Sequence, residues 1–123
     1  MPDVLLVDDD AAVRAMMLTA LELEGLEVVA VGDARTALGW LRKTPPRLLV
    51  TDLYMPGMDG LELLAVAGRV APSVPVLVIS GGGRFQSTTP LAAAERMGAV
   101  STLAKPFSVE ELVAAVRSAL DEA

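Results

Sequence analysis

The sequence contains no cysteine and no histidine. The absence of cysteine excludes disulfides and thiol chemistry, and the absence of histidine excludes imidazole as a general base or as a metal ligand. Any metal site in this protein must therefore use oxygen ligands, which are the ligands that hard cations prefer.

A long apolar run and an excess of positive charge are also missing. No apolar stretch approaches the length of a membrane span, about eighteen residues, and the first residues, Met1-Pro2-Asp3, lack the basic start of a signal peptide. The net charge is −6 and the pI is near 4.5, whereas phosphate binding requires clustered Lys and Arg. We therefore expect a cytoplasmic protein with no membrane insertion and no direct nucleic acid partner.

The pattern along the chain is one of alternating strands and helices. Its 123 residues suffice for a single domain, and the 53% share of apolar residues predicts a large buried core. Five short apolar runs have the pattern of parallel strands buried on both faces. They are Val4–Val7, Glu27–Val31, Leu48–Thr51, Val76–Ile79 and Val100–Leu103.

Segments with apolar residues at helical spacing follow the predicted strands. The first three helices are expected to bury Val13, Met16, Met17, Ala20 and Leu21; then Ala34, Ala37, Leu38 and Leu41; then Leu61, Leu64 and Ala65. A fourth helix is predicted from Thr89 to Gly98, and a fifth begins at the capping box Ser108-Val109-Glu110-Glu111. Five strand–helix repeats predict one parallel sheet with helices on both faces.

Charged and polar residues follow four of the predicted strands. They are Asp8, Asp9 and Asp10 after the first strand, Asp52 after the third, Ser80 after the fourth and Lys105 after the fifth. In an open α/β sheet these strand ends meet at the edge where ligands bind. Two carboxylates about 4 Å apart repel by roughly 4 kcal/mol at an effective dielectric near 20, so a positive charge should balance them. Clustered carboxylates without His or Cys suit Mg²⁺, and Lys105 can supply a second positive charge.

Each of these residues also has an ordinary structural explanation. Asp8 and Asp9 fit the start of the first helix, where negative charge meets the positive end of the helix dipole. Asp52 fits a loop acid, Lys105 a solvated surface side chain, and Ser80 a turn residue before three glycines. The combination favours a site, because independent turn residues need not bring complementary charges to one edge.

Five segments together resemble the receiver domain of two-component response regulators, and the chain is similar to the stand-alone chemotaxis-type regulator. The segments are "LLVDDD" at 5–10, "TDLYMPGMDG" at 51–60, "VPVLVIS" at 74–80, "GA" at 98–99 and "AKPF" at 104–107. The resemblance spans the chain from Val4 to about Leu120 and implies a flavodoxin-like α/β fold with strand order 2-1-3-4-5 and five helices. We expect residues 1–123 to form one receiver domain without an output domain.

The resemblance also implies a role for each site residue. Asp52 would be the phosphoacceptor, Ser80 the switch hydroxyl and Lys105 the partner of the phosphate. Mg²⁺ would be held by Asp8, Asp9, Asp52 and the backbone carbonyl of Tyr54. The Lys105-Pro106 bond is expected to be cis.

The function implied is phosphorelay signal transduction. A sensor histidine kinase or phosphotransfer protein would donate the phosphoryl group to Asp52. Partner binding would then switch on the face formed by the fourth helix, fifth strand and fifth helix, toward an effector protein or an output domain outside this chain. Such a protein catalyses its own phosphorylation and dephosphorylation, but it is a signalling switch rather than an enzyme.

Two alternatives remain open. A phosphatase of the haloacid dehalogenase type would need a second acid two residues after the nucleophile, where this chain has Tyr54. A pseudo-receiver would keep the fold and bind partners without phosphorylation, which the five filled key positions disfavour. This chain also departs from the family in having Thr102 where an aromatic switch residue is usual. A loop containing Phe85 is a candidate replacement, although permanent packing of Phe85 is the simpler explanation.

Overall fold

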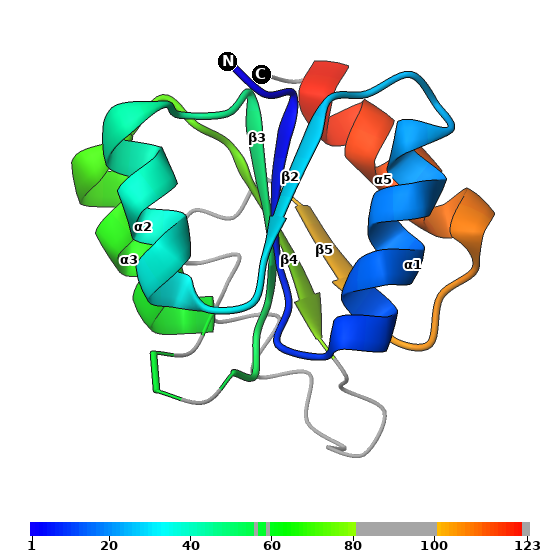
Figure 1. Ribbon diagram of the computed structural model, residues 1–123, viewed down its shortest axis with the longest axis horizontal. Helices are drawn as coiled ribbons and strands as arrows, with labels where there is room; N and C mark the ends of the chain where they lie inside the picture. The colour runs from blue at the N-terminus through cyan, green and yellow to red at the C-terminus, as the bar shows by residue number, and fades with distance from the viewer. Residues whose placement is uncertain (56, 59, 81–100, 122–123) are drawn as a thin grey trace.

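The computed structural model describes residues 1–55, 57–58, 60–80 and 101–121, in which five parallel strands form one sheet of order β2-β1-β3-β4-β5 (Figure 1). The strands are β1 (Val4–Val7), β2 (Val28–Val31), β3 (Leu48–Asp52), β4 (Val76–Ser80) and β5 (Ser101–Ala104). This order and the parallel pairing confirm the predicted flavodoxin-like fold class.

Helices cover both faces of the sheet. The described helices are α1 (Ala11–Glu22), α2 (Ala34–Lys43), α3 (Gly60–Val70) and α5 (Val109–Asp121). Helices α1 and α5 lie on one face, and α2 and α3 lie on the other (Figure 1). The helix predicted from Thr89 to Gly98 and the loop containing Phe85 lie outside the described residues.

The two faces of the sheet form two separate core layers because side chains alternate along each strand. Leu5, Leu49 and Val78 pack with α2 and α3, whereas Leu6 and Val50 pack with α1 and α5. The central strands β1, β3 and β4 are buried throughout, as predicted. The prediction was wrong for β2 and β5, which are at most partly buried because each is an edge strand with only one neighbour.

The buried residues predicted for the helices are confirmed in part. All four residues predicted for α2 are buried, whereas Met16 of α1 is 40% exposed and lies outside the core. In α3 the buried stripe includes Leu63 and Leu64, while Leu61 and Ala65 are only partly buried. Spacing alone identifies an apolar stripe, but packing against the sheet and the neighbouring helix decides which of its residues become buried.

Side-chain caps start three of the described helices, and Asp33 caps α2 by accepting the Thr36 backbone N–H at 2.7 Å. Asp10 Oδ1 accepts the backbone N–H groups of Ala12 at 2.9 Å and Val13 at 3.1 Å, so Asp10 is the N-cap of α1. The alternative in which Asp8 or Asp9 caps this helix is therefore wrong. The capping box at α5 is confirmed, because two reciprocal side-chain to backbone hydrogen bonds join Ser108 and Glu111 at 2.8 and 3.0 Å.

Asp3 joins three segments at the amino-terminal end of the sheet. Its carboxylate accepts the Glu27 backbone N–H at 2.8 Å and pairs with Arg47 at 3.1 Å. The Glu27 hydrogen bond and the Arg47 guanidinium hold the pKa of Asp3 below its ordinary value. The charged form is therefore the one that the folded state prefers.

We expect Asp3→Asn to lower the free energy of unfolding by about 1 kcal/mol at pH 7, as one partly exposed charge-assisted contact would. Because the folded-state pKa is depressed, this contribution is present above the unfolded pKa and is lost as pH falls through the folded pKa. The check is urea denaturation of both proteins between pH 7 and pH 3. A difference that stays constant across that range would contradict the role of the charge.

Candidate functional site

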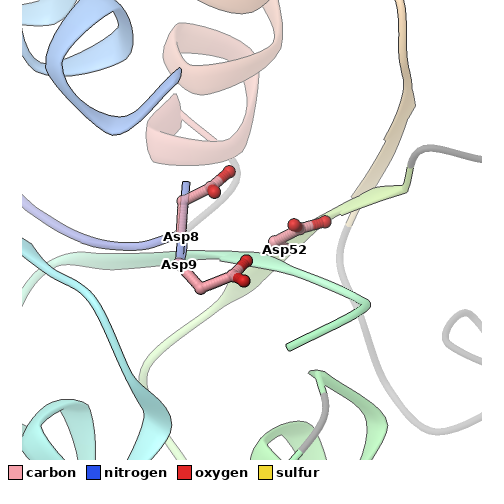
Figure 2. Close-up of side chains that lie close together, drawn as sticks. All are labelled: Asp8, Asp9 and Asp52. Carbon is pink, nitrogen blue, oxygen red and sulfur yellow. The ribbon is translucent and has the colours of Figure 1, made fainter. Parts of the chain in front are cut away.

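Strand register brings the two acidic strand ends together. Val7 pairs with Thr51. Asp8 follows Val7 and Asp52 follows Thr51, so the two acids lie side by side at the edge of the sheet. Figure 2 shows the Asp8 and Asp9 side chains leaving the end of β1 and the Asp52 side chain leaving the end of β3, with the carboxylates gathered in one region. One carboxylate oxygen from each of the three residues lies within 4.8 Å of the others.

The three acids differ in their exposure to water. Asp8 is fully buried and Asp52 is 7% exposed, whereas Asp9 is exposed. Carboxylates at such separations repel one another, and burial strengthens the repulsion because it lowers the local dielectric. A cation bound among the three carboxylates would reduce this repulsion.

Lys105 supplies one such cation. Its Nζ lies 3.5 Å from Oδ2 of Asp8 and 3.5 Å from Oδ2 of Asp52. Its backbone N–H donates to the Ser80 carbonyl at 2.6 Å, which ties the end of β5 to the end of β4. The Lys105-Pro106 peptide bond is cis, as expected.

Strand alternation explains why these groups meet. Asp8 follows Leu6 by two residues, Asp52 follows Val50, and Lys105 follows Leu103. Leu6, Val50 and Leu103 all pack on the layer of α1 and α5. Their successors two positions along therefore lie on the same side of the sheet, just beyond the core.

Burial raises the pKa of the Asp52 carboxyl above its ordinary value. The Lys105 ammonium opposes this shift, and the Asp8 carboxylate adds to it. The balance means that, without a further cation, Asp52 gains a proton more readily than an exposed aspartate does. The pKa of the Asp52 carboxyl will therefore change when another charged group binds beside it.

The remaining residues considered for the site lie outside the cluster of three carboxylates. Ser80 is fully buried, and its Oγ has no hydrogen-bond partner in the part of the chain that the structure describes. It follows Val76 and Val78, which pack on the layer of α2 and α3, and its backbone carbonyl accepts the Lys105 N–H at 2.6 Å. The Tyr54 side chain is 41% exposed, and Thr102 lies partly buried in β5. Asp10 lies outside the metal-binding group and caps α1.

One contact beside the acids was not predicted from the sequence. Arg14 Nη1 donates to the backbone carbonyl of Asp8 at 2.8 Å. The signal available in the sequence is its position, four residues after the N-cap Asp10, which places it one turn into α1 beside the strand end.

The donor set fits a hard divalent cation. All the clustered groups are carboxylates, and Oδ2 of the buried Asp8 has no hydrogen-bond partner among the described residues. Buried polar atoms are almost always satisfied, so such an oxygen is the kind of atom that a metal ligates. The sheet order and the acidic group at the carboxyl edge of the sheet define a flavodoxin-like protein with carboxylates that could hold a metal ion.

Comparison with known sequences assigns the chain to a family. The model of the response regulator receiver domain matches residues 4–117, so the chain belongs to the response regulator receiver domain family. Members of this family act in two-component signalling, and phosphorylation and Mg²⁺ binding are typical of them. None of the helices in the described residues is long and apolar enough to span a membrane.

Two curated relatives are longer proteins. The chain is 37% identical over 121 residues to the nitrogen assimilation regulatory protein NtrX of Azorhizobium caulinodans, covering 97% of this chain and 26% of that protein. It is 40% identical over 119 residues to the C4-dicarboxylate transport transcriptional regulatory protein DctD of Pseudomonas aeruginosa, covering 96% and 25%. The chain thus spans about a quarter of the length of these relatives.

Solved structures share the fold over nearly the whole chain. The receiver domain of NtrX from Brucella abortus superposes with a TM-score of 0.90 at 33% identity, covering 98% of this chain and all of that one. A CheY-like receiver domain protein from Methanospirillum hungatei gives a TM-score of 0.88 at 28% identity, covering 97% and 93%.

Proposed function

We propose that this chain receives a phosphoryl group on Asp52 in a Mg²⁺-dependent reaction and acts as a phosphorelay switch. The observation that carries the proposal is the placement of Asp52, a nearly buried carboxylate with Asp8 on the neighbouring strand and the Lys105 ammonium 3.5 Å away. The residues proposed to hold the metal are Asp8, Asp9, Asp52 and the backbone carbonyl of Tyr54. When bound, Mg²⁺ would neutralise charge on the donor phosphoryl oxygens.

Phosphoryl transfer requires the Asp52 carboxylate to approach a phosphoryl group that is also negatively charged. An oxygen of Asp52 forms a bond to phosphorus while the phosphorus–nitrogen bond of a phosphohistidine breaks, and the electron pair leaves with the imidazole nitrogen. Asp52 must be ionised to attack, and Lys105 favours that form by lowering the pKa against the effect of burial. After transfer, the same ammonium would pair with a phosphoryl oxygen.

Membership of the receiver domain family supports the proposed switch and partners. The buried Ser80 hydroxyl, which has no hydrogen-bond partner among the described residues, would donate to the phosphoryl group on Asp52. The phosphodonor would be a sensor histidine kinase or phosphotransfer protein, and residues 1–123 would act as one receiver domain. The responding face would include β5 and α5, toward an effector protein or an output domain.

A small phosphodonor tests the proposal directly. Incubation with acetyl phosphate and Mg²⁺ should add the mass of one phosphoryl group, and peptide mapping should place it on Asp52. The same incubation in EDTA should leave the mass unchanged. A folded chain that binds Mg²⁺ but takes up no phosphoryl group would establish the pseudo-receiver alternative. Turnover of phosphoester substrates would establish the phosphatase alternative.

A further inference from the structure

We propose that Arg14 is a positioning residue for the acidic pair, and that it sets the Mg²⁺ affinity of the site by fixing the peptide that joins Asp8 to Asp9. The inference rests on the proposed function, because it concerns the same metal site. Arg14 is partly buried in the first turn of α1, and its Nη1 donates to the Asp8 carbonyl at 2.8 Å.

Each polar group of Asp8 except one carboxylate oxygen has a hydrogen bond. Its N–H donates to the Val31 carbonyl at 3.2 Å, and its Oδ1 accepts the Asp10 N–H at 2.9 Å. Its carbonyl accepts from Arg14, which leaves Oδ2 facing Lys105 at 3.5 Å. Arg14 is thus the side chain that holds the peptide plane leading into Asp9.

Asp9 depends on that peptide more than Asp8 does. Asp8 is enclosed by the core, whereas Asp9 is exposed, so packing does little to place its carboxylate. Its direction is set by the backbone that precedes it. Groups that orient metal ligands in this way typically change metal affinity or activity about 10- to 100-fold when they are removed.

Gly32 leaves the space that the guanidinium occupies. A Cβ at this position would lie 3.0 Å from Arg14 Nη1 and 3.6 Å from Cζ, so an alanine there forces the guanidinium to move. The φ angle of Gly32 is not positive, which makes alanine compatible with the backbone. Gly32→Ala therefore shifts the Arg14 guanidinium by a few tenths of an ångström, without changing any charge.

The sign of the effect separates positioning from electrostatics. Removing a positive charge near a cation site would by itself strengthen Mg²⁺ binding, because cations repel. Removing a contact that positions a metal ligand would instead weaken Mg²⁺ binding. A loss of affinity in Arg14→Met therefore reports the hydrogen bond rather than the charge.

The experiment is a double-mutant cycle of Arg14→Met and Gly32→Ala in the full chain, with Mg²⁺ affinity measured by titration calorimetry. We expect Arg14→Met to weaken binding about 10-fold and Gly32→Ala to weaken it by a smaller factor. Gly32→Ala should have no further effect in the Arg14→Met background, because its target is gone. Arg42→Met, which removes an exposed arginine of α2, is the matched control and should leave the affinity unchanged.

A second readout needs no metal. Amide hydrogen exchange in EDTA should be faster across residues 8–10 in Arg14→Met than in the parent chain, while the central strand β3 keeps its protection. Unchanged or tighter Mg²⁺ binding in Arg14→Met, or fully additive effects in the cycle, would overturn the inference while the parent chain still bound Mg²⁺ and took up phosphate. Failure of the parent chain itself to bind Mg²⁺ would overturn the proposed function and this inference together.

Discussion

Asp52→Asn is expected to abolish phosphoryl uptake from a small donor under conditions that fully label the parent chain. An amide lacks the charged oxygen that attacks phosphorus, and the Lys105 ammonium would no longer face a carboxylate at residue 52. Intact mass measured over time gives the result directly.

Asp9→Ala should lose nearly all phosphoryl uptake because it weakens metal binding. Lys105→Ala should lose signalling more than metal affinity.

Asp10→Asn is the matched control for these variants. Asp10 belongs to the same acidic run but caps α1, and asparagine is about as good an N-cap as aspartate. It should therefore keep both its stability and its phosphoryl uptake. Phosphate mapped to Ser80 or Ser108 instead of Asp52 would refute the assignment of the phosphoacceptor.

Mg²⁺ is expected to stabilise the folded chain strongly. Three carboxylate oxygens lie within 4.8 Å of one another, and the ammonium of Lys105 pairs with two of these acids. A ligand that binds only the folded state stabilises it by RT ln(1 + [L]/Kd), about 2.7 kcal/mol at a hundredfold excess over Kd. Thermal unfolding of the parent chain across a Mg²⁺ series should show this rise in melting temperature.

Neutralising one acid should reproduce part of that stabilisation without metal. We expect Asp9→Asn to unfold at a higher temperature than the parent chain in EDTA and to respond little to Mg²⁺. Asp52→Asn should gain more stability than Asp9→Asn, because burial already disfavours the charge of Asp52 whereas Asp9 is exposed. Asp10→Asn should keep the Mg²⁺ response of the parent chain. A melting temperature that falls in Asp9→Asn would refute the repulsion between the acids.

Local sequence determined much of this protein. The central strands, the buried stripe of α2 and the capping box at Ser108 each follow from residues close together in the chain. The chemistry of the edge also follows, because parallel strands present their carboxyl ends together and the residues after them are acids, a serine and a lysine. The absence of Cys and His left an all-oxygen metal site as the only kind available.

Tertiary structure decided what depends on register and on neighbouring elements. The edge strands are only partly buried because the sheet ends there, and Met16 is 40% exposed although its spacing matches that of the buried Ala20. Spacing along the chain does not show that the Lys105 ammonium reaches two acids on different strands. Nor does it show that Arg14 holds the Asp8 carbonyl in space left by Gly32, since these contacts join segments whose distance is fixed only when the helices pack on the sheet.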